Sequence, residues 1–150
     1  MECLFCRIVA GEIPSRQVYA DEAAIAFLDI SPWHVGHTLV IPRRHVDDLL
    51  ADPAALTEIA PAISATSALL TQRLGADGLN LLSSSGATAG QEVLHLHVHL
   101  VPRYSHRPGL REPGRESSRY EYTVGNYALS DRIGATQGRC QALDGEAVSS

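Results

Sequence analysis

Three histidines alternate with aliphatic residues in the segment GQEVLHLHVHLVPR, which covers positions 90–103. Successive side chains of an extended strand point to opposite faces, so His95, His97 and His99 would share one face. The aliphatic face is expected to join the core, and the histidine face to line a site that uses titratable rings. We predict a strand over about 93–101 for this segment.

A neutral imidazole can attack phosphorus near pH 7, because its unperturbed pKa is about 6.5. One ring nitrogen attacks while the other donates a proton to a fixed acceptor. The middle ring, His97, is best placed to attack, with a neighbour on each side to position phosphate oxygens. One metal ion bound by all three rings is disfavoured, since His95 and His99 would lie about 13 Å apart along a strand. A solvated face with accidental histidines is the remaining alternative.

Cys3 and Cys6 are separated by two residues, a gap that lets both thiolates reach one metal ion. The alternatives are a pair of buried thiols and a redox dithiol. A redox motif would normally begin a helix after a strand in a βαβ context, which is missing here. Metal binding and buried thiols therefore both stay open at this point.

The composition indicates one compact domain of 150 residues with a formal net charge of −5. The absence of a basic excess disfavours a nucleic-acid partner. The N-terminal residues do not resemble a secretory signal, and no uninterrupted apolar run reaches the roughly 18 residues of a membrane span. We therefore expect a cytoplasmic protein with no membrane partner.

The remaining pattern predicts short elements around one long helix. We expect a short helix over 4–10, strands around 18–20, 24–30, 37–42 and 78–85, and a loop over 105–120 followed by a short helix near 127–135. The long helix should begin at Asp52-Pro53 and end at Gly75, with a kink at Pro61. Its buried stripe is predicted to contain Leu56, Ile59, Ile63, Leu70 and Leu74.

The chain resembles the histidine-triad (HIT) family, in particular its Hint-like bacterial branch. The resemblance is carried by the His-x-His-x-His motif and by three further stretches: LFCRIVAGEIPS, AFLDISPWHVGHTLVIPRRH and GLNLLSSSG. It implies an α+β HIT fold with an antiparallel sheet of about five strands, one long helix and a short N-terminal helix, assembled as a homodimer. Residues 1–104 would form the HIT domain and 105–150 a C-terminal extension that is partly loop.

The family's catalytic roles fall on four positions. His97 would form a covalent nucleotidyl-histidine, which water later hydrolyses. His99 would hydrogen-bond the α-phosphate, Gln91 would lie near the scissile bond and the leaving group, and His37 would lie beside the triad.

The family's nucleotide-binding positions are also present. Asp29 matches the carboxylate that binds the ribose hydroxyls, which is chemically sensible because a carboxylate accepts two O–H donors. The base would be sandwiched by four apolar residues, Phe5, Ile8, Phe27 and Ile30.

Two positions depart from the family pattern and concern the phosphate and the leaving group. Ser84 stands where many Hint-like proteins have an asparagine that contacts phosphate, and a hydroxyl can still donate a hydrogen bond there. Glu92 stands where some have a serine. An ionised Glu92 would repel the phosphate, although its backbone N–H could serve instead.

Bacterial members with this cysteine pair bind zinc, which implies a site of Cys3, Cys6, His45 and His95. Four protein ligands fill the tetrahedron of zinc, so the ion would be structural.

The resemblance implies hydrolysis of nucleoside 5′-phosphoramidates or related adenylated compounds, with a purine nucleotide such as AMP as the bound group. Cleavage of dinucleoside polyphosphates is one alternative, and a nucleotide-binding regulatory protein with vestigial activity is another. A zinc hydrolase with water at an open metal site is the third.

Overall fold

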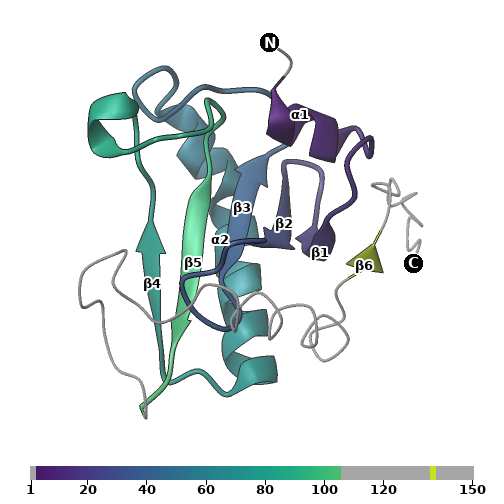
Figure 1. Ribbon diagram of the computed structural model, residues 1–150, viewed down its shortest axis with the longest axis vertical. Helices are drawn as coiled ribbons and strands as arrows, with labels where there is room; N and C mark the ends of the chain where they lie inside the picture. The colour runs from purple at the N-terminus through teal and green to yellow at the C-terminus, as the bar shows by residue number, and fades with distance from the viewer. Residues whose placement is uncertain (1–2, 106–135, 138–150) are drawn as a thin grey trace, which may run out of the picture.

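The computed structural model describes residues 3–105 and 136–137 (Figure 1). The two helices are α1 (Leu4–Val9) and α2 (Ala54–Leu74), and a short 3-10 helix, η1, covers Ala87–Ala89. The strands are β1 (Arg16–Ala20), β2 (Ala24–Leu28), β3 (Thr38–Pro42), β4 (Gly78–Leu82), β5 (Val98–Arg103) and β6 (Thr136–Gln137).

The strands form one antiparallel sheet in the order β4-β5-β3-β2-β1-β6. Strand β6 has only two residues, which pair with the start of β1. The predicted α+β fold, with about five antiparallel strands, one long helix and a short N-terminal helix, is confirmed. The predicted helix near 127–135 lies outside the described residues, as does the loop beyond Ser105.

The sheet is covered differently on its two faces because residues alternate along each strand. In β2, Ala24, Ala26 and Leu28 join the core cluster that contains the buried side chains of α2. Ile25 and Phe27 point the other way and pack with residues of α1. Figure 1 shows α2 running along the back of the sheet and α1 crossing one end of it. One face of the sheet therefore packs against α2, and the opposite face packs against α1.

Helix α2 begins and ends nearly as predicted. The carboxylate of Asp52 accepts the backbone N–H of Ala54 at 3.0 Å, and Gly75 ends the helix in the left-handed conformation with φ 66°. Pro61 lies inside the helix without ending it. The residues buried on its inner face are Ala55, Ile59, Ala62, Ile63, Thr66 and Leu70. Leu56 and Leu74 are only partly buried against the same core.

Within the described residues, α2 is also the one helix long and apolar enough to cross a membrane by length and composition. Its inner face, however, is covered by the sheet, with Ile59 and Leu70 fully buried. One face of α2 therefore packs on the core of the domain.

The strand predicted over about 93–101 is wrong at both ends, because β5 covers Val98–Arg103. The ladder with β3 stops at the pair Val40↔Val98, although β3 itself continues to Pro42, and the ladder with β4 stops at Leu82↔His99. The chain before Val98 has therefore left both ladders. The backbone N–H of Leu96 bonds instead to the carbonyl of Val46 at 2.6 Å. The alternation nevertheless persists, since Leu96, Val98 and Leu100 all enter the α2-side core.

The turn before His37 depends on Gly36, whose φ is +85°. A Cβ there would lie 2.5 Å from Leu74 Cδ1 and 3.0 Å from Pro102 Cγ. We expect Gly36→Ala to lower the free energy of unfolding by about 2–4 kcal/mol, through left-handed strain and overpacking. Gly75→Ala is the matched control, because its φ is +66° with no heavy atom within 4 Å, and it should cost only about 1–2 kcal/mol. Urea denaturation measures both, and equal losses would contradict the packing argument.

Candidate functional site

A pocket of about 540 Å³ opens on the sheet face that carries α1. One side is apolar and includes Phe5 and Ile8 from α1 and Phe27 from β2. The other side is polar and includes Asp29, which directly follows β2, together with histidines of the triad, His97 and His99. The pocket therefore joins an apolar slot to a group of hydrogen-bonding side chains.

The apolar slot is built from aromatic edge contacts. The rings of Phe5 and Phe27 are 5.8 Å apart at an interplanar angle of 69°, and Phe5 also contacts the ring of His97 at 5.4 Å. Phe5, Ile8 and Phe27 are buried, whereas Ile30 lines the pocket with 73% of its surface exposed. A flat apolar ring would bury these side chains further, and Ile30 most of all.

The ring of His97 has a fixed orientation. Its Nδ1 lies 2.8 Å from the main-chain carbonyl oxygen of His95. A carbonyl can only accept, so Nδ1 carries the proton and Nε2 of the neutral ring keeps its lone pair. His97 lines the pocket, so Nε2 is the ring atom that could act as a nucleophile there.

His99 has the opposite tautomer, set by a chain of hydrogen bonds. The backbone N–H of Trp33 donates to His37 Nδ1 at 3.0 Å, so the neutral His37 ring carries its proton on Nε2. His37 Nε2 donates to His99 Nδ1 at 2.9 Å. The proton of His99 is therefore on Nε2, where it can be donated to a group in the pocket.

Burial keeps both of these rings neutral. It lowers the pKa of His37 to about 3, with further contributions from the charges of Arg103 and His97. Burial likewise lowers the pKa of His99 to about 3. The charges of the neighbouring His37 and His97 rings make smaller contributions in the same direction, whereas the charge of Asp29 raises this pKa. His99 is thus a neutral hydrogen-bond donor throughout the physiological range.

Asp29 lies at the polar end of the pocket. Its Oδ1 accepts the backbone N–H of Ser31 at 2.7 Å, which holds the carboxylate in place just after β2. Its Oδ2 lies 3.8 Å from His37 Nε2. The side chain can accept hydroxyl groups of a ligand from this position.

Gln91 is buried behind the pocket wall rather than in it. Its Oε1 accepts the backbone N–H of Gly86 at 2.7 Å, and its Nε2 donates to the carbonyls of Asp47 and Val93 at 2.6 and 3.0 Å. These bonds occupy the amide and fix the 86–93 loop. The adjacent Glu92 is exposed and does line the pocket.

Neither His37 nor Ser84 lines the pocket. His37 is fully buried beneath His99, and Ser84 follows the end of β4 with partial exposure. The predicted phosphate contact of Ser84 stays a prediction.

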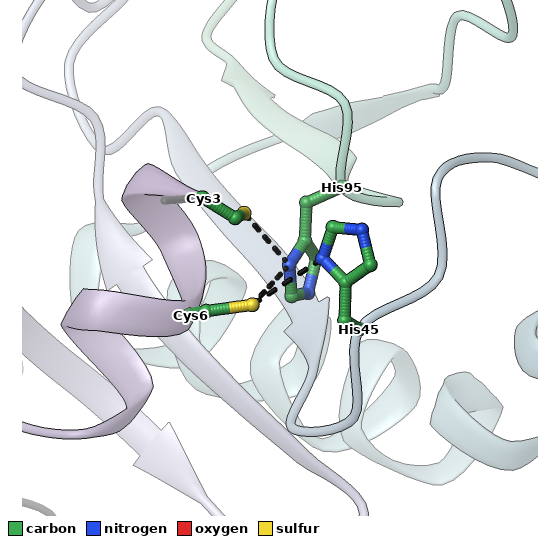
Figure 2. Close-up of side chains that lie close together, drawn as sticks. All are labelled: Cys3, Cys6, His45 and His95. Atoms are coloured by element: carbon green, nitrogen blue, oxygen red, sulfur yellow. Dashed lines mark hydrogen bonds between the residues drawn. The ribbon is translucent and has the colours of Figure 1, made fainter. Parts of the chain in front are cut away.

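Cys3, Cys6, His45 and His95 come together beside the N-terminal part of α1 (Figure 2). Their ligand atoms all lie within 4.8 Å of one another. The Sγ atoms of Cys3 and Cys6 lie 3.4 and 3.6 Å from His95 Nδ1, and Cys6 Sγ lies 3.3 Å from His45 Nδ1. Zn–S and Zn–N bonds in a tetrahedron give S···N edges of about 3.6 Å, so the observed separations fit a bound zinc ion.

The outer hydrogen bonds of these histidines also fit a metal site. His95 Nε2 lies 2.9 Å from the carbonyl of Pro42, and His45 Nε2 lies 2.8 Å from Oδ1 of Asp47. Both partners are acceptors, so the protons are on Nε2 and the Nδ1 lone pairs are free to bind a cation. Burial and the neighbouring Cys3 raise the pKa of Cys6 to about 11, so a metal ion would have to displace a proton there.

A second cluster, Asp29, His37 and His99, is close enough to hold a metal ion by distance alone. The donor from Trp33 at His37 Nδ1 places a proton on His37 Nε2, the atom that faces the cluster. A cation there would require that nitrogen to lose its proton. The arrangement fits a proton-bearing network and not a metal site.

The family model described as HIT domain matches residues 10–106, more than half of the 150-residue chain. The chain belongs to the HIT family. Among relatives, an uncharacterised HIT-like protein of Methanocaldococcus jannaschii is 45% identical over 104 residues, which cover 68% of this chain and 79% of the relative. The adenylylsulfatase HINT3 of Arabidopsis thaliana is 38% identical over 106 residues, covering 68% of this chain and 52% of that protein.

Solved structures of the HIT family share the fold. A zinc-bound histidine triad family protein from Mycobacterium smegmatis has a TM-score of 0.63 and 34% identity, covering 89% of this chain and 96% of its own. A HIT family hydrolase from Clostridium thermocellum has a TM-score of 0.63 and 33% identity, covering 73% and 96%.

Some residues of this HIT site were not assigned from the sequence. Trp33 lines the pocket and stacks on His99, with ring centroids 4.7 Å apart and an interplanar angle of 14°. Leu39 also lines it, and its alternation with Val40 in β3 was the available signal. Arg16 lines the pocket too, and no local pattern distinguishes it from a surface arginine.

The two low-pKa histidines predict acid sensitivity of the HIT fold. The unfolded chain takes up protons near pH 6.5 whereas folded His37 and His99 do so near pH 3, so stability is lost as pH falls below 6.5. Between pH 6.5 and 5 we expect a loss of about 1.5 kcal/mol per histidine. Urea denaturation at both pH values measures it. His99→Gln should remove about half of this dependence, and an unchanged slope in that variant would contradict the assignment.

Proposed function

We propose that this HIT protein is a nucleotide hydrolase or transferase that cleaves nucleoside 5′-phosphoramidates, or related adenylated compounds, at the α-phosphate. HIT-family membership supports a nucleotide hydrolase in general. The observation that supports the proposed chemistry most is the hydrogen bond from His97 Nδ1 to the carbonyl of His95. It leaves Nε2 of a neutral ring available in a pocket that has room for a nucleotide.

The proposed reaction has two steps. His97 Nε2 forms a bond to the α-phosphorus while the P–N bond to the leaving amine breaks, and the amine nitrogen takes up a proton from solvent. Water then attacks the same phosphorus and releases a proton to solvent, the P–Nε2 bond breaks, and AMP leaves with His97 restored. The carbonyl of His95 stabilises the positive charge that develops on the ring during attack.

His99 would bind the phosphate as a donor. Its Nε2–H can point at a non-bridging oxygen, where negative charge increases in the transition state. Because His37 holds the tautomer and burial keeps both rings neutral, this donor needs no protonation event. His37 is thus proposed to position His99 and not to contact the substrate.

The other pocket residues would bind the nucleoside. Phe5, Ile8, Phe27 and Ile30 would enclose the base, and Asp29 would accept the ribose hydroxyls. A purine would fill the apolar slot better than a pyrimidine because it buries more apolar surface.

Glu92 would influence which leaving groups the pocket accepts. Its carboxylate lines the pocket together with His97, so it would repel a polyphosphate or a sulfate and tolerate a neutral or cationic amine. This charge favours phosphoramidates over dinucleoside polyphosphates. Gln91, whose amide is occupied by the loop backbone, would act by holding Glu92 and its neighbours in place.

We further propose that Cys3, Cys6, His45 and His95 bind a structural zinc ion. The donor set and its separations match zinc, and one solved relative is described as zinc-bound. Four protein ligands leave no coordination position for a catalytic water.

A homodimer is proposed for the same molecule. Strand β4 is one edge of the sheet, and Leu81 on it is 53% exposed. An uncovered edge strand with exposed apolar side chains is a natural pairing surface. A cytoplasmic location stays a prediction.

The activity test compares wild-type protein with His97→Ala on adenosine 5′-phosphoramidate, adenylyl sulfate and diadenosine polyphosphates. We expect the phosphoramidate to be cleaved fastest. His97→Ala should lose turnover but still bind AMP, because the base and ribose contacts remain. His99→Ala should lower kcat by about 10²–10³-fold, and His99→Gln by less, since it keeps an N–H donor. Near-normal turnover by His97→Ala would refute the mechanism.

The zinc proposal is tested by metal analysis of untagged protein purified without chelator. We expect about one zinc ion per chain, since four ligand atoms converge on one point. Cys6→Ser should bind much less, while Arg7→Ala, on the exposed side of α1, should bind as wild type. A zinc content far below one per wild-type chain would reject the site.

A further inference from the structure

We propose that the metal ion at Cys3, Cys6, His45 and His95 positions the base-binding wall of the pocket, so that metal occupancy sets nucleotide affinity. Cys3 and Cys6 would then be positioning residues for the nucleobase. The inference rests on the proposed nucleotide site and the proposed zinc site, and it adds a coupling between them.

The two sites share helix α1. Cys3 immediately precedes the helix and Cys6 lies within it, and the intervening residues Leu4 and Phe5 line the pocket. Ile8, two residues after Cys6, lines it as well. One face of this helix therefore carries metal ligands and another carries pocket wall, with no flexible segment between them.

Helix α1 cannot hold this position by its own stability. It has six residues, and no side chain caps its N-terminus. Isolated helices of this length are unstable in water, because nucleation costs more than so few hydrogen bonds return. Its place must therefore come from tertiary contacts at its ends and along its buried face.

One of the proposed metal ligands outside α1, His95, belongs to the same segment as His97. His95 lies two residues before His97, and the ring of Phe5 contacts His95 at 5.8 Å and His97 at 5.4 Å. An ion bound by both cysteines and His95 would join α1 directly to the segment that carries the nucleophile. Figure 2 shows α1 presenting both thiols toward this ring.

The fourth ligand connects the ion to the loop that presents Glu92. His45 Nε2 bonds to the carboxylate of Asp47, and the main-chain carbonyl of Asp47 accepts the amide of Gln91 at 2.6 Å. Gln91 in turn binds Gly86 and Val93. The ion therefore lies where α1, the triad segment and the 86–93 loop meet.

Apolar packing is the competing explanation for how α1 is held. Phe5 and Ile8 belong to a core cluster with Ile25, Phe27 and other residues of β2 and β3. If this packing suffices, the pocket wall stays in place without the ion. The two explanations differ in one observable, the affinity of metal-free protein for AMP.

The experiment measures the dissociation constant of AMP by calorimetry for zinc-loaded wild type, for the chelator-treated protein and after zinc is restored. We expect removal of the ion to weaken binding at least about tenfold and restoration to reverse it. The fluorescence of Trp33, the single tryptophan of the chain, gives an independent signal from within the pocket. Hydrogen exchange should become faster in α1 while β2 and β5 stay protected.

Variants test the coupling from both sides of the ion. His45→Ala removes a ligand that is outside α1 and does not line the pocket, and Cys3→Ser with Cys6→Ser removes the ligands associated with α1. Both should weaken AMP binding alike and raise KM more than they lower kcat. Arg7→Ala, which loses only an exposed ion pair with Glu12, is the control and should bind AMP as wild type.

Equal AMP affinity of loaded and metal-free protein, within twofold, would overturn the inference and leave both proposed sites standing. A wild-type protein without zinc would overturn it together with the metal site. Zinc-loaded protein that binds no AMP would overturn it together with the proposed function. These three results are distinguishable from the same set of titrations and metal analyses.

Discussion

A neutral imidazole has one N–H and one lone pair, and this constraint organises the whole site. Whichever nitrogen meets an acceptor must carry the proton, which leaves the other as a lone pair, and a donor has the reverse effect. The carbonyl of His95 thus leaves a lone pair on Nε2 of His97, whereas the chain from Trp33 through His37 leaves an N–H donor on Nε2 of His99. Chemically identical side chains, two to sixty-two residues apart, acquire different hydrogen-bonding roles from the groups that surround them.

The sheet supplies those surroundings because its two faces pack against different elements. One face packs on α2 through small and aliphatic residues, and the other carries α1 and the pocket. His99 belongs to a strand of this sheet, while His97 lies just before it, where the backbone turns away from the ladder and its carbonyls become available to side chains. The end of the β3–β5 ladder at Val98 is therefore part of how the ring of His97 is oriented.

The proposed metal site and the proposed nucleotide site are neighbours because both use residues at the start of α1. Cys3 and Cys6 bracket the residue, Phe5, whose ring contacts both His95 and His97. Helix α1 has six residues and forms part of the pocket wall, so tertiary contacts must hold it in place. The core packing of Phe5 and Ile8 is one such contact, and the proposed metal ion would add another.

The sequence by itself showed the alternation of the three histidines and the two-residue gap between Cys3 and Cys6, because both are local patterns. The fold class and the set of four proposed metal ligands came from the resemblance to the HIT family. The limits of β5 were misjudged, since a strand extends only as far as it pairs with its neighbours, and where the β3–β5 ladder ends depends on residues distant in sequence. The buried place of Gln91, the tautomers of His97 and His99, and the part played by Trp33 were decided only by tertiary structure. Each depends on hydrogen-bond or stacking partners brought together from distant segments, and no local spacing encodes which atom will face which.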